Sequence, residues 1–307
     1  EKMTEDTRQN SGSSKIKAVG IVAKARLPEA PEVVSAIKNW LYERNVTVMI
    51  ETETADLVGL DQSKTFSRSS LPSTIDLLVV LGGDGTLLGI ARSVAELETE
   101  KDIPILAINF GSLGFLTEIT LPELYQALES IIDGTADIDE RQMLRSRVIR
   151  DTQTIADRVV LNDVVVSKSA LSSIIDLTIR VGDQFVTQLR SDGLIIASPT
   201  GSTAYSMAAG GPIVHPLVDA LVITPIAPHT LTNRPIVIPS NTAVRITPTL
   251  SSSHHSAYVS FDGQSGLELN HGDTITVERG THALKVIRAK SRGYFAVLHE
   301  KLKWGQR

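Results

Sequence analysis

In the first part of the chain, short apolar runs alternate with segments whose apolar residues recur every three or four positions. The apolar runs lie at residues 15–23, 46–51, 75–81 and 103–110. The segments with helical spacing lie at residues 31–44, 87–97 and 122–132. Strands that alternate with helices are typical of a parallel sheet flanked by helices. The pattern therefore predicts an α/β domain over residues 15–134, whose last helix stops where Gly134 supplies a terminating glycine.

From residue 145 onward, apolar residues recur at every second position, which is the period of a half-buried strand. Strands are predicted at residues 145–150, 159–167, 174–181, 194–198 and 243–247. Turn sequences at residues 182–184, 270–273 and 279–280 separate such runs, as in packed antiparallel sheets. We therefore predict a β-rich, sandwich-like domain over residues 135–282, followed by two further strand runs in the terminal segment, residues 283–307.

The first segment, residues 1–14, is polar. It has neither the basic nor the apolar stretch of a signal peptide, and we interpret it as a flexible tail. No apolar run approaches the roughly 18 to 20 residues that a membrane helix needs, so we expect no membrane association and, by default, a cytoplasmic location. The sequence opens with Glu1, which leaves the true N-terminus open.

Composition excludes several classes of protein. The chain has 307 residues, 42% of them hydrophobic and 21% charged, which suffices for a sizeable core and excludes a disordered or fibrous protein. A net charge of −5 gives no overall attraction to nucleic acid, so we expect no such partner. The absence of cysteine excludes disulfides and cysteine nucleophiles. The seven histidines lack metal-ligand spacing, and acidic residues 137–140 are typical of a solvated face.

The sharpest local feature is Gly-Gly-Asp-Gly-Thr at residues 82–86, between a predicted strand and a predicted helix. Glycines let a backbone approach phosphates, and the amide groups at a helix start favour anions. We assign Gly82, Gly83, Gly85 and Thr86 to a phosphate loop. Asp84 would repel a phosphate, so its carboxylate needs another task, such as accepting a proton from a hydroxyl nucleophile or ordering a metal. The alternative is a tight turn with Asp84 as a helix N-cap.

A second feature is residues 198–212, which combine small residues with one aromatic side chain. Thr203 and Ser206 offer hydroxyls, and Ala204 leaves room for a ring. Tyr205 offers both a stacking face and a phenol. The segment therefore suits the wall of a binding site, although a glycine-rich turn that caps a short helix explains it equally well.

Three shorter pieces place polar side chains beside strands: Asn162-Asp163, residues 190–193 and residues 261–264. A carboxylate next to an amide can read ribose hydroxyls and an adenine edge, because the carboxylate accepts hydrogen bonds and the amide both accepts and donates them. Taken singly, each piece is better explained as an ordinary turn.

Taken together and in this order, four motifs resemble the NAD kinase family. They are GGDGT at 82–86, FGSLGFLTE at 110–118, LNDVVV at 161–166 and SDGLIIASPTGSTAYSMAAGGPI at 191–213. The resemblance spans about residues 16–300, and the last motif is far more specific than GGDGT, which lipid kinases also carry. It implies a two-domain NAD kinase-like fold, with the active site in the cleft between the domains and residues 283–307 returning to the N-terminal domain.

The resemblance also implies a reaction, which is transfer of the γ-phosphoryl group of ATP to the 2′-hydroxyl of the adenosine ribose of NAD. Asp84 matches the proton acceptor of the family. A divalent cation, expected to be Mg²⁺, would be held mainly by nucleotide phosphates and not by protein side chains alone. The resemblance further implies a homo-oligomer, either a dimer or a tetramer.

Carried over residue by residue, the resemblance assigns NAD-binding positions in several parts of the chain. They are Asp84, Gly85, Asn162, Asp163, Arg190, Asp192, Thr203, Ala204, Tyr205, Ser206, Met207, Ala208, Ala227 and Gln264. Phe115, Arg234 and Asp262 are also expected near the site, without an assigned role. Many family members have glutamate where this chain has Asp163, so the reach of this carboxylate differs.

Two other functions remain open at this point. One is a catalytically silent NADP-sensing module that uses the same cleft, which the intact GGDGT disfavours because a sensor needs no proton acceptor. The other is a lipid kinase, which residues 198–206 and the lack of a membrane-binding stretch disfavour.

Overall fold

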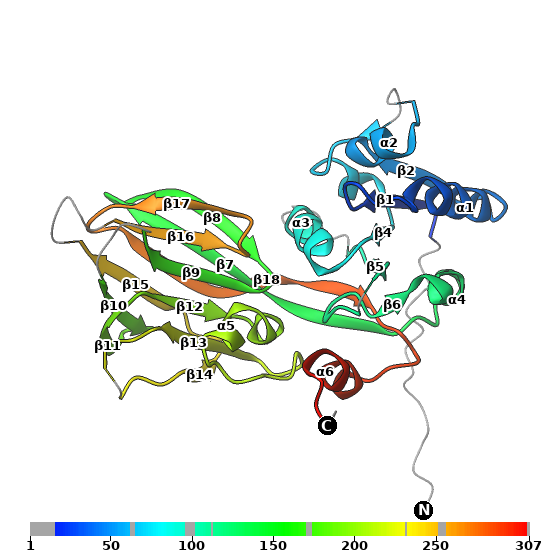
Figure 1. Ribbon diagram of the computed structural model, residues 1–307. Helices are drawn as coiled ribbons and strands as arrows, with labels where there is room; N and C mark the ends of the chain where they lie inside the picture. The colour runs from blue at the N-terminus through cyan, green and yellow to red at the C-terminus, as the bar shows by residue number, and fades with distance from the viewer. Residues whose placement is uncertain are drawn as a thin grey trace, which may run out of the picture.

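A computed structural model describes residues 16–61, 65–95, 102–111, 113–169, 174–230, 232–250 and 256–305. The predicted tail, residues 1–14, lies outside these ranges. The chain forms an N-terminal α/β half and a C-terminal β-rich half, joined by two long strands (Figure 1). No helix within the described ranges is both long and apolar enough to span a bilayer.

The N-terminal half is a parallel sheet with helices on both faces. Its strands are β1 (Ala18–Ala23), β2 (Thr47–Glu51), β3 (Thr65–Phe66), β4 (Leu77–Leu81), β5 (Ile105–Asn109) and β6 (Ile119–Thr120), and β5-β4-β1-β2-β3 are adjacent in that order with β6 beside β5. Its helices are α1 (Ala30–Tyr42), α2 (Thr52–Val58), α3 (Asp84–Ala95) and α4 (Leu124–Ile132), with short 3₁₀ turns η2 (Leu71–Thr74) and η3 (Leu121–Glu123). Helices α1, α2 and α4 share one core with the sheet, and α3 packs on its other face.

Two features of this half follow directly from sequence. The predicted helix over 122–132 begins as η3, where Thr120 and Glu123 form a capping box, and continues as α4. It ends at Asp133, followed by Gly134 with φ of 69°. Because that backbone conformation favours glycine, the predicted helix end is confirmed. Helix α2 was not predicted, since its seven residues carry too short a pattern.

The C-terminal half consists of two packed antiparallel layers. One is a six-stranded sheet in the order β14 (Ile236–Pro239), β13 (Ala220–Ile226), β12 (Gly193–Ala197), β9 (Asp163–Lys168), β16 (Ala257–Phe261) and β17 (Ser265–Leu269). The other contains β7 (Ile138–Arg150), β8 (Gln153–Val160), β10 (Ile175–Val181), β11 (Gln184–Ser191), β15 (Val244–Thr249) and β18 (Thr274–Ile287). Alternate residues of both layers, such as Val164, Ile196, Leu177 and Ile246, meet in one core. The predicted sandwich-like architecture is confirmed.

Strand β18 joins the two halves into one sheet. Val286 pairs with Ile105 of β5, while the length of β18 pairs with β7 from Thr274 to Ile287. The parallel sheet and the outer antiparallel layer are therefore parts of a single 12-stranded sheet, visible in Figure 1 as two ribbons that cross from one half to the other.

Several local predictions were wrong. The predicted strand 159–167 is two strands, because the backbone turns at Leu161 and Asn162. The predicted turn at 279–280 lies inside β18, at a register shift against β7. The second strand run predicted in 283–307 is instead helix α6 (Tyr294–Leu302), which buries Val297 and Leu298. Its aromatic and β-branched residues favour a strand locally, and tertiary packing overrides that preference.

The acidic segment 137–140 is not simply a solvated face. Asp139 is buried, and its carboxylate lies 2.8 Å from the guanidinium of buried Arg141. The pairing accounts for its burial, since a buried carboxylate requires a cationic or hydrogen-bonding partner.

Candidate active site

Asp84 opens α3, and two glycines separate it from the buried strand β4. Its carboxylate is not bonded as a cap of its own helix. Oδ2 accepts a hydrogen bond from the Phe115 amide at 2.9 Å. Oδ1 accepts three, from the amides of Leu116 and Thr117 at 3.1 and 3.0 Å and from the Thr117 hydroxyl at 2.9 Å. Asp84 therefore fixes the segment 115–117 against the start of α3.

This arrangement depends on glycine at two places. A Cβ atom on Gly114 would collide with Asp84 Oδ1 and with the Thr117 hydroxyl, so only glycine lets the segment come this close. A Cβ atom on Gly82 would lie 3.0 Å from the Cβ atoms of both Thr86 and Lys24. The glycines of the two motifs therefore allow close approach of backbone to side chain.

A second aspartate holds the turn that carries Asn162 and Asp163. Asp262 accepts hydrogen bonds from the amides of Leu161, Asn162 and Asp163 at 2.8, 2.7 and 3.1 Å. Asp262 itself has φ of 50°, a left-handed conformation that is costly outside glycine and tolerated mainly by Asp and Asn. The sequence predicted that Asp262 lies near the site but not that it holds this turn. The contact joins residues 100 positions apart, so no local pattern in the sequence indicates it.

Asp163 lies in an unusual electrostatic environment. Its side chain is buried, and burial together with the neighbouring Asp262 carboxylate raises the pKa of Asp163 to about 7. Both effects act in the same direction, because an anion is disfavoured by lost hydration and by a like charge. Burial also raises the pKa of Asp262, although the three backbone amides oppose that shift.

Residues 198–208 pack directly on this turn. They form the 3₁₀ turn η4 (Thr200–Thr203) and the single-turn helix α5 (Tyr205–Ala208). The Ser198 hydroxyl donates to the Leu161 carbonyl at 2.5 Å, and a Cβ on Gly201 would overlap the Asn162 carbonyl. The structure therefore brings the 198–208 segment together with Asn162 and Asp163, as expected for two walls of one site.

Two of the hydroxyls in this segment already form hydrogen bonds within the protein. Ser206 is buried and bonded to Thr224 at 2.8 Å, and the Thr203 hydroxyl donates to the Thr200 carbonyl at 3.2 Å. By contrast, the Tyr205 side chain is exposed, so its ring is available to a ligand.

Three of the predicted binding residues lie away from the Asn162–Asp163 turn in space. Ala197 pairs with Asp163, whereas Gly193, at the other end of β12, pairs with Ser167 and with Ile226. Residues 190, 192 and 227 flank that other end, and Gly193 lies about 13 Å from Ala197 at 3.3 Å per strand residue. One chain therefore does not bring Arg190, Asp192 and Ala227 together with Asp163.

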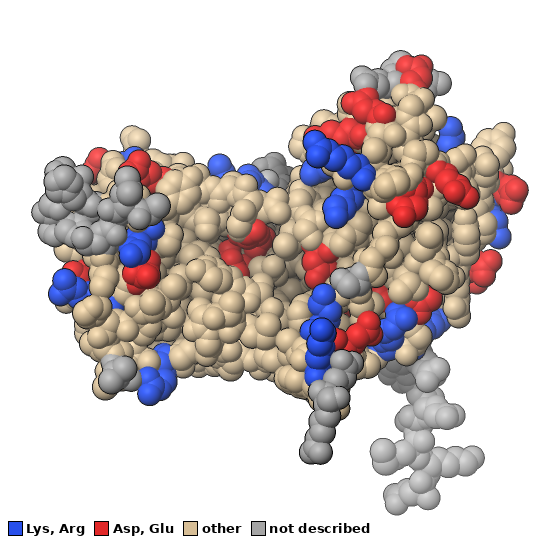
Figure 2. Space-filling view, viewed as in Figure 1, with Lys and Arg blue, Asp and Glu red and all other residues tan. Residues whose placement is uncertain are grey.

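The surface between the two halves is hollowed. Figure 2 shows a depression there, with acidic side chains inside it and basic side chains on either side. Among the described residues, no three His, Cys, Asp or Glu side chains are grouped so that they could hold a metal ion.

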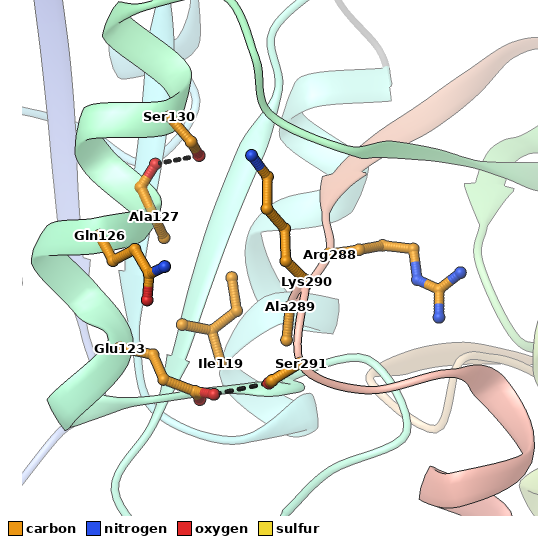
Figure 3. A pocket seen from close by; sticks show the side chains of 9 residues that line it. All are labelled: Ile119, Glu123, Gln126, Ala127, Ser130, Arg288, Ala289, Lys290 and Ser291. Carbon is orange, nitrogen blue, oxygen red and sulfur yellow. Dashed lines mark hydrogen bonds between the residues drawn. The ribbon is translucent and has the colours of Figure 1, made fainter.

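A separate cavity of about 250 Å³ lies between α4 and residues 288–291, away from the predicted site residues (Figure 3). Lys290 extends along it, and Glu123 accepts a hydrogen bond from the Ser291 hydroxyl at 2.7 Å. Burial would raise the pKa of Glu123, but hydrogen bonds from Thr120, Ser291 and Arg292 outweigh that effect and lower it to about 2. These contacts fasten the C-terminal segment to the α/β half.

Comparison with known proteins assigns the family. Residues 19–136 match the ATP-NAD kinase N-terminal domain, and residues 161–289 match the ATP-NAD kinase C-terminal domain. The chain is 45% identical to an NAD kinase of Geotalea daltonii over 292 residues, which cover 95% of this chain and all of that protein. The chain belongs to the ATP-NAD kinase family. It is therefore an enzyme and a kinase.

Other proteins are similar to this chain over most of its length. An NAD kinase of Geobacter sulfurreducens is 46% identical over 95% of this chain and all of its own length. Yeast NADH kinase, solved with NADH, superimposes with a TM-score of 0.86 at 27% identity, covering 95% of this chain and 89% of that one. An Archaeoglobus fulgidus NAD kinase, solved with ATP, has a TM-score of 0.70 at 22% identity, covering 94% and 100%, and shares the fold.

Proposed function

We propose that this kinase transfers the γ-phosphoryl group of ATP to the 2′-hydroxyl of the adenosine ribose of NAD, giving NADP and ADP. A relative named NAD kinase is 45% identical over 95% of this chain and its own full length, and the family description names ATP and NAD. The observation that carries the proposal is the placement of Asp84, a fixed carboxylate between two glycines at the start of a helix.

The hydrogen bonds of Asp84 indicate which oxygen acts. A carboxylate has about four acceptor positions over its two oxygens. Oδ1 already accepts three hydrogen bonds, whereas Oδ2 accepts one, from Phe115. Oδ2 therefore keeps room for the attacking hydroxyl, and we assign it as the proton acceptor. The four bonds also hold the carboxylate in one orientation, which matters because phosphoryl transfer depends mainly on positioning and charge neutralisation.

The residues around Asp84 supply the phosphate loop. The first amides of a helix have no i−4 carbonyl partner, and here they belong to Gly83, Asp84 and Gly85, whereas the Thr86 amide donates to the Gly83 carbonyl at 2.9 Å. With Gly82 before them, these amides are proposed to receive the phosphoryl group that meets Asp84. Mg²⁺, when bound, would neutralise phosphate charge, and we propose that nucleotide phosphates provide most of its ligands.

The NAD adenosine half is proposed to lie on the turn that carries Asn162 and Asp163. Asn162 and Asp163 would bind ribose hydroxyls and the base edge, and the segment from Thr203 to Ala208 would form the facing wall. Exposed Tyr205 provides an aromatic surface for stacking. In this arrangement, residues 15–134 and 135–282 contribute opposite sides of the cleft.

We further propose a homo-oligomer. Arg190, Asp192 and Ala227 resemble binding positions of the family, yet they flank the end of β12 that lies away from Asp163. A second copy of the chain could bring the partner subunit's Arg190 to this cleft. Edge strand β14 also exposes Ile236 and Val237 to a partner. Light scattering of the purified chain tests this proposal, and a monomer that turns over NAD at the full rate would refute it.

The reaction is tested by mixing the chain with NAD, ATP and Mg²⁺ and measuring NADP with a dehydrogenase that is strictly dependent on NADP. NADP should accumulate with wild type and hardly at all with Asp84→Asn. A folded wild-type chain that binds NADP but forms none from any donor would instead support the sensing module. Phosphorylation of vesicle lipid would support the lipid kinase.

A further inference from the structure

A second cavity lies in the region between the halves, and its lining includes Gln264, one of the predicted NAD-binding positions. It has a volume of about 230 Å³ and lies where α3, the end of β8 and the β16–β17 turn meet. The α/β half contributes Gly89 and Arg92, and the β-rich half contributes Arg158, Asp262 and Gln264. A ligand in this cavity would therefore contact both halves at once.

Two arginines and one aspartate are the charged residues that line the cavity. Arg92 and Arg158 line it from opposite halves. A third guanidinium, that of Arg68, places Nη1 3.3 Å from the position of a Cβ on Gly89. Asp262 is the one acidic residue among the lining residues, and its two oxygens are already bonded to three backbone amides.

The other nitrogens of Arg68 are already bonded. Nε lies 2.6 Å from Glu51 and Nη2 lies 3.2 Å from Glu53, so these two ion pairs fix the plane of the guanidinium. Nη1 is the nitrogen that points toward Gly89. The ion pairs with Glu51 and Glu53 compensate the charge of Arg68, so the two arginines that line the cavity are the groups suited to an anion. Each guanidinium presents a fork of N–H donors that matches phosphate oxygens.

The distance from Asp84 limits which part of a substrate can reach this cavity. Arg92 follows Asp84 by eight residues on the same helix, or about 12 Å at 1.5 Å per residue. The phosphoryl group that meets Asp84 cannot reach that far. The remainder of a phosphoryl donor continues beyond that group. Gln264 lies beside the same stretch of α3, with Oε1 3.9 Å from the Gly89 Cβ position.

We propose that this cavity binds the part of the donor's condensed phosphate chain that lies beyond the transferred group, with Arg92 and Arg158 as its ligands from opposite halves. The proposal rests on the proposed kinase reaction for its donor. A condensed phosphate chain is common to ATP and inorganic polyphosphate, and its binding across the two walls would draw the halves together over Asp84.

The test measures steady-state kinetics of wild type, Arg158→Gln and Arg92→Gln, with ATP in one arm and inorganic polyphosphate in the other. Each variant should raise the KM of a donor that uses the cavity about tenfold and leave the KM of NAD unchanged. A rise for ATP alone or for polyphosphate alone would identify the donor whose chain reaches the site. Arg158→Lys should recover part of the loss. Arg245→Gln, an exposed arginine on the distant strand β15, is the matched control and should change neither constant.

Binding of inorganic tripolyphosphate, measured by calorimetry, separates this inference from the proposed reaction. Weaker binding to Arg158→Gln than to wild type would support the site even if no NADP were formed. If both folded variants bind tripolyphosphate like wild type and keep the KM of both donors, the inference is wrong, whether or not the chain is active.

Discussion

At the scale of single residues, two aspartates have parallel tasks. Asp84 and Asp262 each collect backbone amides from a segment far away in sequence, Asp84 from residues 115–117 and Asp262 from residues 161–163. Each carboxylate accepts several charge-assisted hydrogen bonds, which are stronger than neutral ones. The two loops of the candidate site are therefore held in place by hydrogen bonds to charged carboxylates. Substitution of Asp84 or Asp262 should change the geometry of the site as well as its chemistry.

Asp84→Asn should lower turnover at least about 100-fold, because the amide cannot take the proton of a hydroxyl. It should also release the loop, since an amide offers one acceptor oxygen where the carboxylate offers two. Hydrogen exchange at the Phe115, Leu116 and Thr117 amides should become faster in the variant. Normal turnover would refute the assignment of Asp84 as proton acceptor, and unchanged exchange would refute its structural task.

Asp163→Asn tests the electrostatics of the second loop. Because the pKa of Asp163 is raised from 3.8 to about 7, the native state favours the neutral form, and this contribution to stability is lost as the pH rises from about 4 through about 7. Asparagine does not ionise, so the variant does not lose this stability as the pH rises. The variant should therefore be more stable than wild type at pH 8, by a few kcal/mol at most.

Chemical denaturation at pH 5 and at pH 8 measures this difference. The gain of Asp163→Asn over wild type should be clearly smaller at pH 5 than at pH 8. An equal difference at the two pH values would show that Asp163 titrates in the native state as it does when unfolded.

At the scale of elements, the segment 113–118 shows how a glycine motif becomes a site. Gly114 meets Asp84 and Thr117 in space, whereas Gly111 has no neighbour within 4 Å of its Cβ position. Both glycines belong to FGSLGFLTE, and periodicity cannot distinguish them. Position 114 requires glycine because the fold brings it against Asp84, about thirty residues away in the sequence.

Gly114→Ala should therefore lower both the stability, by about 1 to 3 kcal/mol, and the turnover, because an overpacked methyl group displaces the Asp84 carboxylate. Gly111→Ala is the matched control and should alter neither by much. Thermal denaturation and turnover of the two variants provide the comparison. Equal behaviour of the pair would contradict the close approach of Gly114 to Asp84.

At the scale of the whole molecule, strand β18 and the segment after it connect the halves. Arg292 donates to the Glu118 carbonyl at 2.8 Å and to Glu123 at 3.0 Å, and Ser291 donates to Glu123. Glu118 directly follows the loop that Asp84 holds. The C-terminal segment is therefore bonded to the same stretch of chain as the candidate proton acceptor, which couples the docking of the two halves to the site.

Glu123→Gln should weaken this docking by about 2 kcal/mol at pH 7, because charge-assisted hydrogen bonds are lost. The lowered pKa of Glu123 contributes stability that is present above pH 4.5 and is lost as the pH falls toward 2. The difference between variant and wild type should shrink over that range. Glu140→Gln, whose side chain is 65% exposed, is the control and should have little effect in denaturation experiments.

Sequence periodicity determined much of this protein. The buried runs that became β1, β2, β4 and β5, the helix end at Gly134 and the antiparallel character of the second half all follow from local patterns. The motif GGDGT also marked the start of α3. These features are local, because burial of one face and the conformational freedom of glycine depend on neighbouring residues.

Only the tertiary structure decided which distant pieces meet. It joined the halves through β18, changed the predicted final strand into α6, and set Asp262 beneath the turn of Asn162 and Asp163. It also placed Arg190 and Asp192 at the far end of β12 and gathered Arg92 and Arg158 around one cavity. The physical reason is that such contacts depend on the order and register of the strands in a sheet. The residues next to a position in sequence do not determine which distant strand pairs with it.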